Sequence, residues 1–484
     1  QGASRFSIPV ISLSFNENDF YDYTDGISVA GIDFDTWRLA NPTEEVNENL
    51  GNFNRSGDAY ERVANLNYFV NGNEVVNQKV GLRIHGDYSR LYPSKSMRVY
   101  ARSSYGTDKL EFPFFSDEPY TAYERFVIKN SGSDFYNTMF RDALCNELVK
   151  DLRMETEAHK QVITFINGEY WGILALRERY DNNYFKQVYN IDAVDLLENE
   201  GEGKEGDDAD YLNFISYFQN NDLSVPANYT YIQTRMDVDN FTDYFISNIY
   251  LQNDDWPSNN IIYWRKKTAG YQPNAANGHD GRWRWAYHDV TSTFDHADFD
   301  SMAYATTLDE NINPLWSTLL LRKLLANDTF RIRFINRFAD LMNTNFLSSR
   351  IITQIDQMAA VIAPEMNDQY FRWKAPLDNG DWQYHLNEEK DFANQRPAFQ
   401  RLHIRNKFNI SSNLNVTLDV SDAAHGYIKM NTITLQEGTP GITGNPYPWT
   451  GVYFHNIPVT VKAIPMSGYQ FSHWSGDSNS TEAE

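Results

Sequence analysis

Hydrophobic and polar positions alternate with a period of two along much of the first 180 residues, a pattern that predicts β-strands with one buried face. A short strand is also expected at residues 26–29. Two of the alternating stretches are separated by Asn167-Gly168, which is typical of the tight turn of a β-hairpin. The clearest predicted strands are residues 8–15, 76–85, 96–102, 125–129, 161–166 and 170–176. The first part of the chain is therefore expected to form a sheet.

Hydrophobic positions recur at helical spacing in other stretches. One such helix is expected at residues 136–152 and carries Cys145, the single cysteine, which excludes an intramolecular disulfide. Beyond residue 236 helical patterns dominate, and the clearest are residues 241–251, 315–325, 330–343 and 349–362. The predicted fold class is α+β, with a mixed β-sheet lobe followed by a helical lobe.

The pattern changes again beyond residue 412, where short alternating strands are separated by Gly and Pro turns. We therefore expect two domains, residues 1–412 and a small all-β module at residues 413–484 that is cut short. Within the first domain, residues 1–180 are expected to be rich in sheet and residues 236–412 rich in helix. The acidic, Gly-rich run at residues 198–210 is expected to be a solvated loop, with a calcium site as the alternative.

The overall charge restricts the partners of the chain. Lys and Arg total 42 against 65 Asp and Glu, so the formal net charge is -23. This charge opposes binding to nucleic acid or to an anionic membrane and favours a basic protein partner. The sequence also contains no apolar run of the roughly 18 residues that would predict a membrane span.

Two stretches concentrate polar side chains next to predicted strands. Asp255 and Asn260 lie in the loop before an apolar strand, and Asp289 ends the strand that follows. Phosphoryl transfer needs a carboxylate for the hydroxyl proton, oxygen ligands for Mg²⁺ and a cation on the phosphates. The spacing of Asp255 and Asn260 matches the Asp-x-x-x-x-Asn catalytic loop of protein kinases. Spacing alone leaves a second interpretation open, because Asp and Asn are also common in turns beside strands.

Several separated segments resemble the CotH (spore coat protein H) family of atypical protein kinases. The similarity covers a region from residue 8 to about residue 410. The segments that carry it are Gly86 to Arg102 with its Tyr-Pro-Ser-Lys-Ser, Phe126-Val-Ile-Lys129, Arg141-Asp142, Ile166 to Ile173, Glu178, Asn253 to Asn260, His288-Asp-Val290 and Thr293-Phe294. The resemblance implies a divergent protein-kinase-like fold and phosphorylation of Ser residues, on spore-coat partners in that family, with ATP.

The resemblance also implies roles for the acidic residues. Asp255 is expected to be the catalytic base, while Asn260 and Asp289 are expected to bind Mg²⁺ or Mn²⁺. The chain departs from the usual kinase pattern at Asn253-Asp254, where standard kinases have His-Arg, and at Thr291, where relatives often carry an acidic residue. Metal binding is therefore expected to be weakened or altered.

The residues that contact ATP are less clearly marked. Lys95 is preferred as the catalytic, phosphate-binding lysine, and Lys129 is the alternative because its strand resembles the lysine strand of kinases. No GxGxxG precedes the strands, so the loop that contains Ser89 and Arg90 is expected to cover the phosphates. Glu178 is expected to hold the lysine or the ribose, and a surface ion pair is the alternative.

The end of the chain carries a second resemblance. Gly468-Tyr-Gln-Phe-Ser-His-Trp-Ser-Gly476 is similar to the repeat of internalin-type B repeats, which occur on bacterial surface proteins. This resemblance implies an exported protein with an extracellular or cell-surface location.

Three functions are consistent with these features. The first is an ATP- and Mg²⁺-dependent kinase acting on Ser or Thr of secreted or surface proteins. The second is a pseudokinase that serves as a binding or scaffold module, since the catalytic loop departs from the kinase pattern. The third is transfer of AMP to a protein hydroxyl by a kinase-like fold.

Overall fold

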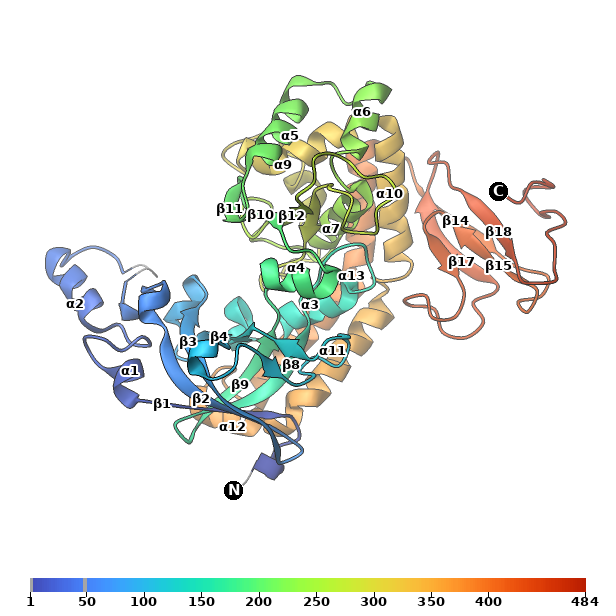
Figure 1. Cartoon of the computed structure of the whole chain (residues 1–484). Helices are drawn as coiled ribbons and strands as arrows, with labels where there is room; N and C mark the ends of the chain where they lie inside the picture. The colour runs from blue at the N-terminus through green and yellow to red at the C-terminus, as the bar shows by residue number, and fades with distance from the viewer. Residues whose placement is uncertain (1–2, 47–49) are drawn as a thin grey trace.

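The first lobe is a β-barrel. The structure, a computed structural model, describes residues 3–46 and 50–484. Strand β1 pairs with β8 in parallel, the other neighbours pair antiparallel, and the sheet closes in the order β1-β2-β3-β4-β7-β9-β8 (Figure 1). The strands are β1 (Val10–Phe15), β2 (Arg62–Val70), β3 (Asn73–His85), β4 (Ser96–Tyr100), β7 (Arg125–Lys129), β8 (His159–Ile166) and β9 (Glu169–Arg177). The predicted strands and hairpin are confirmed, but the sheet closes on itself.

The barrel interior explains the alternating pattern. Side chains such as Leu66, Val80, Leu82 and Val99 are buried in one hydrophobic cluster. The expected strand at residues 26–29 is wrong, because these residues fold back on α1 (Glu17–Tyr21) before α2 (Gly31–Ala40). The backbone N–H groups of residues 27 and 28 donate to the carbonyls of Asp19 and Phe20 in α1 and not to a neighbouring strand.

Helix α3 (Arg141–Val149) follows β7 and is shorter than expected, because residues 132–136 form a 3₁₀ turn. Cys145 is fully buried in this helix, as its apolar neighbours predicted. A small pair of strands, β5 (Leu110–Glu111) and β6 (Ala122–Tyr123), lies between β4 and β7 in the chain.

The second lobe combines helices with a small sheet in the order β11-β10-β12-β13. Its central helix, α7 (Val238–Tyr250), is buried along nearly its whole length. The strands are β10 (Val194–Glu198), β11 (Glu202–Glu205), β12 (Ile262–Lys266) and β13 (Arg284–Ala286). The remaining helices are α4 (Asn182–Tyr189), α5 (Ala209–Asn220), α6 (Pro226–Gln233), α8 (Ser301–Tyr304), α9 (Leu315–Leu325), α10 (Asp328–Met342), α11 (Ser348–Ile362), α12 (Met366–Trp373) and α13 (Asn379–Phe408).

The acidic run at residues 198–210 is not only a loop. Its first half forms the hairpin of β10 and β11, and its last residues begin α5. Lys204 on β11 forms an ion pair with Glu198, which neutralises part of the local charge. The charge pattern indicated solvent exposure correctly but gave no sign of strand pairing.

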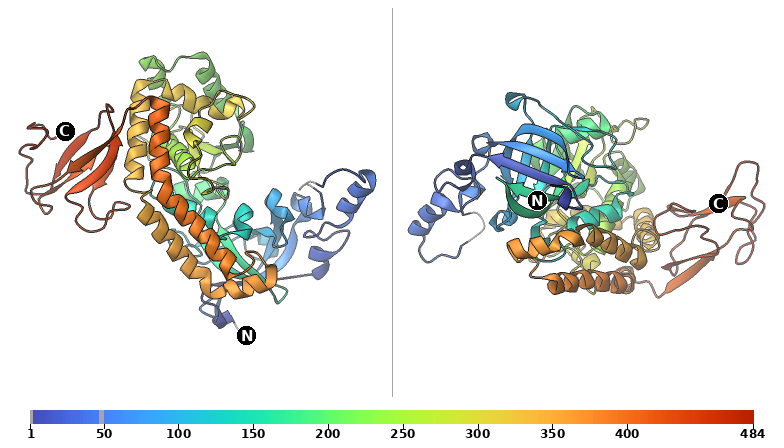
Figure 2. Two further views of the ribbon diagram at one scale, coloured as in Figure 1. Left: turned by 180° about the vertical axis from the view of Figure 1, so that it is seen from behind. Right: turned by 90° about the horizontal axis from the view of Figure 1, so that it is seen from below.

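One long helix connects the lobes. Figure 2 shows α13 running along both of them. Its Glu389 contacts Arg141 at the start of α3, while Arg396 donates to the carbonyl of Tyr250 at the end of α7. Because α13 bonds both to α3, which follows the barrel strand β7, and to α7 of the helical lobe, it fixes the two lobes relative to each other.

The all-β module follows α13 and projects to one side (Figure 1). Strand β14 (Asn413–Leu418) pairs with β17 (Trp449–Phe454), while β15 (Gly426–Met430) pairs with β16 (Ile433–Leu435) and β18 (Val461–Pro465). The α+β class, with a kinase-like sheet lobe, a helical lobe and a terminal β-module, is confirmed. Among the helices of residues 3–46 and 50–484, none has the length and apolar character needed to cross a bilayer.

Candidate active site

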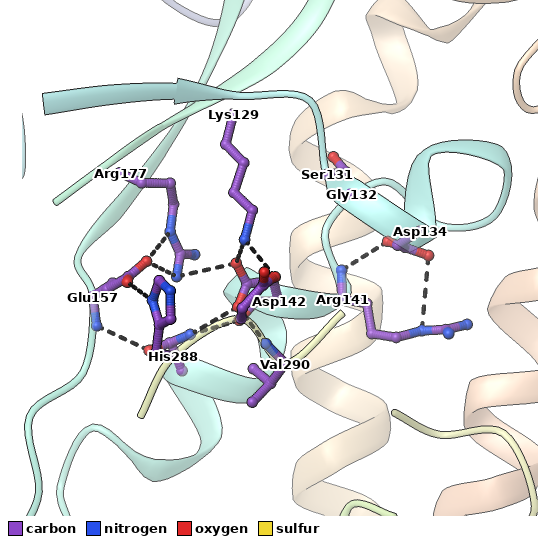
Figure 3. Close-up of polar contacts among 12 residues, drawn as sticks. Lys129, Ser131, Gly132, Asp134, Arg141, Asp142, Glu157, Arg177, His288 and Val290 are labelled. Atoms are coloured by element: carbon purple, nitrogen blue, oxygen red, sulfur yellow. Dashed lines mark hydrogen bonds and ion pairs between the residues drawn. The ribbon is translucent and has the colours of Figure 1, made fainter. Parts of the chain in front are cut away.

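Lys129 is the centre of a cluster of charges between the two lobes. It is the last residue of β7, and its Nζ lies 2.8 Å from Oδ2 of Asp142 on α3 (Figure 3). The same Nζ lies 3.0 Å from Oδ1 of Asp289 after β13. Burial opposes a charged ammonium, but the carboxylates of Asp142 and Asp289 outweigh this effect and raise the pKa of Lys129. The lysine is therefore held in its charged form between the sheet lobe and the helical lobe.

Further charged residues complete a ring around this lysine. Arg177, the last residue of β9, lies 3.4 Å from Asp142 and 3.1 Å from Glu157. Glu157 in turn contacts Nδ1 of His288 at 2.5 Å. Burial raises the pKa of the Asp142 carboxyl, but Arg177 and Lys129 lower it by more. The carboxylates of Asp142, Glu157 and Asp289 outnumber the permanent cations Lys129 and Arg177, so the ring favours further positive charge.

Helix α3 is anchored at its first turn. Asp134 accepts a hydrogen bond of 2.9 Å from the backbone N–H of Arg141 (Figure 3). The guanidinium of Arg141 lies 2.9 Å from Oε1 of Glu389 on α13. Both acidic residues are fully buried, so these bonds lie in a medium of low dielectric. They fix the helix that presents Asp142 to Lys129.

Asp289 lies in a segment tied to the loop that follows α7. The backbone N–H of Asp254 donates to the carbonyl of Ser292 at 2.9 Å, and that of Phe294 donates to Leu251 at 3.0 Å. The backbone φ of Asp289 is 46°, in the left-handed region that non-glycine residues seldom adopt. Such conformations cluster at functional sites, where the surrounding structure enforces them.

Asp255 and Asn260 lie together on the loop before β12. The Asp255 carboxylate accepts hydrogen bonds from Asn260 at 2.8 Å and from Asn259 at 3.1 Å. Asn260 is also left-handed, with φ 55°. The backbone bond from Asp254 to Ser292 holds this loop beside the segment of Asp289. Desolvation and the negative charge of Asp289 raise the pKa of Asp255. Three of the residues expected at the site are thus brought together.

The loop between β3 and β4 covers the end of β7. Asn130, next to Lys129, donates to the carbonyls of Ser94 at 2.6 Å and Ser89 at 3.3 Å. Arg90 donates to the carbonyl of Gly86 at 2.5 Å and to that of Phe53 at 3.1 Å, so its guanidinium is used by backbone carbonyls of the sheet lobe. The loop is therefore placed over Lys129, but the contacts of Ser89 and Arg90 are internal to this part of the protein.

Lys95 lies apart from the charge cluster. Its ammonium donates to the carbonyl of Arg90 and lies 4.5 Å from the centre of the Phe53 ring. Burial lowers the pKa of Lys95 to about 8. The structure thus brings Lys129 to Asp289 and gives Lys95 a place inside the loop, the reverse of the preference drawn from the sequence.

Glu178 lines the cleft pocket, a hollow between the barrel and β12 that also includes Lys129 and His288. Its carboxyl accepts hydrogen bonds from the Tyr120 hydroxyl and from the backbone N–H of Ala158. Burial raises the pKa of Glu178 to about 7. A roomier cavity of about 420 Å³ lies behind α3, near Lys150 and Met358, and its lining does not contain Lys129 or Asp289.

The donor set is suited to a magnesium nucleotide. Mg²⁺ prefers oxygen ligands and is usually held by one or two carboxylates together with phosphate oxygens. Asp289 provides such oxygens next to Lys129, and Asp255 and Asn260 provide them on the loop before β12. Within residues 3–46 and 50–484 no three His, Cys, Asp or Glu side chains are grouped as a metal site, so phosphate oxygens would have to complete the coordination.

Sequence reasoning assigned no role to Asp142, Glu157, Arg177 or His288. Arg177 gave a usable signal, because it ends an apolar run in which a charge needs a buried partner. Asp142 was noted only as part of a resembling segment. Its pairing with Lys129 depends on how α3 packs against the barrel, which local patterns do not specify.

Comparison with known families identifies both parts of the chain. The family model described as CotH kinase protein matches residues 82–400, well over half of the chain. The chain therefore belongs to the CotH kinase family. The model of the divergent InlB B-repeat domain matches residues 417–484, which form the terminal β-module. A search of curated proteins finds no match to the chain.

Proposed function

We propose that this protein transfers the γ-phosphoryl group of ATP, with Mg²⁺ or Mn²⁺, to Ser or Thr hydroxyls of a basic protein substrate. The observation that carries the proposal is the placement of Lys129 between Asp142 and Asp289. Kinases use the same combination of a lysine on a sheet-lobe strand, an acidic partner on the adjacent helix and a metal-binding Asp.

Each residue has a role in this reaction. Lys129 offers its ammonium to the phosphates, Asp289 and Asn260 would hold the metal ion, and Asp255 orients the acceptor hydroxyl. Bound Mg²⁺ would neutralise charge that develops on the phosphate oxygens. As the acceptor oxygen bonds to the γ-phosphorus and the bond to ADP breaks, the hydroxyl proton passes to Asp255. The raised pKa of Asp255 makes it a stronger base than an ordinary carboxylate.

The setting of the reaction is part of the proposal. A net charge of -23 favours a basic acceptor segment. The divergent InlB B-repeat domain at residues 417–484 supports an exported protein that works outside the cell or at its surface. The sequence resemblance to bacterial surface repeats motivates this location, and fractionation of cells that express the full chain would test it.

Labelled ATP tests the reaction itself. The wild type is incubated with Mg²⁺ or Mn²⁺, a Ser-rich basic peptide and ATP labelled at either the γ- or the α-phosphate. The matched variants are Asp289→Asn at the site and Asp192→Asn, an exposed surface carboxylate. The proposal expects γ-label on the peptide or on the protein itself with the wild type and with Asp192→Asn, and none with Asp289→Asn.

Other outcomes would replace the proposal. Label from the α-phosphate alone would indicate AMP transfer. Absence of both labels, with ATP binding still detected by calorimetry, would favour a pseudokinase scaffold. These two alternatives retain the fold and the nucleotide site but differ in the chemistry.

A further inference from the structure

Two arginines of the cleft pocket are not used by the charge ring. Arg98 lies on β4 and Arg179 directly follows β9, and both line the pocket together with Lys129 and His85. Each is partly exposed, so a ligand in the pocket can reach them. A concentration of positive charge at this point is unexpected in a chain with a net charge of -23.

The other cations of the pocket have carboxylate partners. Lys129 is paired with Asp142 and Asp289, Arg177 with Glu157, and Lys204 with Glu198. In contrast, across residues 3–46 and 50–484 no ion pair to a carboxylate is formed by Arg98 or Arg179. Arg98 donates to Nδ1 of His85 at 3.0 Å, and Arg179 donates to the Tyr100 hydroxyl at 3.5 Å.

The positive charges of this pair are therefore not neutralised. Burial and the charge of Arg179 lower the pKa of Arg98. Burial, Arg98 and Lys129 lower the pKa of His85 well below its usual range. Two carboxyls, Glu157 and Glu178, also line the pocket. Glu178 is already engaged by Tyr120 and Ala158, and Glu157 by Arg177 and His288. Like charges in a partly buried site repel each other strongly unless an anion lies between them.

We propose that Arg98 and Arg179 form an anion subsite that binds the phosphate chain of a nucleoside di- or triphosphate. This inference rests on the proposed function, because it assigns the nucleotide to the same cleft. A guanidinium donates two parallel hydrogen bonds to phosphate oxygens, and its planar geometry suits this ligand better than an ammonium. Lys129 and the subsite would then hold different parts of one polyphosphate.

Calorimetry with three ligands tests the subsite. ATP, adenosine and inorganic tripolyphosphate are titrated into the wild type, Arg98→Gln, Arg179→Gln and Arg62→Gln. Arg62 is the control because it lies in the same barrel on β2 and bonds to backbone carbonyls outside the pocket. Each subsite variant should weaken ATP and tripolyphosphate binding by about tenfold to a hundredfold, the usual effect of losing a charged hydrogen bond. Adenosine binding and the Arg62→Gln affinities should not change.

The results separate the subsite from the reaction. If γ-phosphoryl transfer occurs but Arg98→Gln and Arg179→Gln bind ATP as the wild type does, the subsite is wrong and the kinase proposal stands. If tripolyphosphate binds through the arginines but no transfer occurs, the subsite stands and the kinase proposal fails. An equal loss of adenosine binding would mean that the arginines stack on the base, which overturns the subsite. If neither ATP nor tripolyphosphate binds the wild type, both are wrong.

Thermal unfolding provides a readout that does not depend on turnover. Removal of either repelling charge should leave the melting temperature of the ligand-free protein unchanged or raise it. Tripolyphosphate should raise the melting temperature of the wild type and of Arg62→Gln more than that of the two subsite variants. A ligand-free Arg98→Gln and Arg179→Gln that both melt well below the wild type would show that the pair is structural, against the proposal.

Discussion

Lys129 and Asp289 form an ion pair of 3.0 Å although they are 160 residues apart in the chain. The lysine belongs to the barrel, and the aspartate belongs to the segment that follows β13 in the helical lobe. The same ammonium also contacts Asp142 at 2.8 Å. The two carboxylates differ in environment, because the side chain of Asp142 is 6% exposed and that of Asp289 is 37% exposed.

This difference in burial predicts that removing Lys129 and removing the Asp289 carboxylate change the stability of the protein to different extents. Lys129→Met should lower the free energy of unfolding by about 3 kcal/mol, since it leaves the buried Asp142 with only Arg177 as a cation. Asp289→Asn should change stability by less than about 1 kcal/mol, because its carboxylate remains partly in water. Both variants should lose phosphoryl transfer. Urea unfolding measured beside the labelled-ATP assay checks this, and equal stability losses would contradict it.

Asp255 should act on the rate and not on nucleotide affinity. Its carboxylate is held by Asn259 and Asn260 and contacts no cation of the ring. Asp255→Asn keeps the shape of the side chain but removes the base, so kcat should fall by about a hundredfold to ten-thousandfold. The dissociation constant for ATP should remain within about twofold.

Asn259→Ala is the control for this prediction. It removes one hydrogen bond to Asp255 and leaves the carboxylate itself in place. Its kcat should fall far less than that of Asp255→Asn. A loss of ATP binding in Asp255→Asn would instead mean that the residue holds the metal or the nucleotide.

Features of this protein that depend on neighbouring residues could be predicted from the sequence, whereas features that depend on contacts between distant segments could not. The barrel strands were found because alternation reports which face is buried, as at Leu66 and Val80. Asp255, Asn260 and Asp289 could be named as candidates because they lie in two polar loops beside strands. Lys129 was ranked below Lys95 because a strand-end lysine has no local pattern that reveals its partners. The roles of Asp142 and Arg177 depend on packing between distant segments, which periodicity does not encode.

Lys95 should make the stability of the protein depend on pH, although it lies apart from the charge cluster of the site. Burial lowers its pKa to about 8 in the folded state, against about 10.4 in the unfolded chain. Between these values the unfolded state binds the proton and the folded state does not, so the free energy of unfolding should rise with pH. The rise should total about 3 kcal/mol between pH 8 and 10.5.

Comparison of Lys95→Met with the wild type isolates this effect. The variant has no ammonium to deprotonate, so its unfolding free energy should rise less over the same pH range. Lys79→Met, at an exposed position of β3, is the matched control and should follow the wild-type profile. Denaturant unfolding at several pH values measures the difference. A wild-type profile parallel to that of Lys95→Met would show that Lys95 stays charged in the folded protein.

A buried carboxylate on α10 helps to fix the β-module to the helical lobe. Asp340 on α10 is fully buried and accepts hydrogen bonds from Asn431 at 3.1 Å, from the backbone of Thr432 at 3.0 Å and from the Tyr453 hydroxyl at 2.9 Å. Asn343, which caps the C-terminal end of α10, exchanges two bonds of 3.0 Å with the backbone of Val452. These contacts hold β15, β17 and their connections against the helix.

Asp340→Ala should therefore release the module, because it removes the acceptor of four donors, which belong to Asn431, Thr432 and the buried Tyr453. We expect proteases to cleave the variant between α13 and β14, near residues 409–412, while the wild type resists cleavage there. Asp328→Ala, at the exposed start of α10, is the control and should remain intact. Phosphoryl transfer to a short peptide should be retained by both variants, since α10 contributes no residue to the charge ring. Loss of transfer in Asp340→Ala alone would mean that the module supports the active site itself.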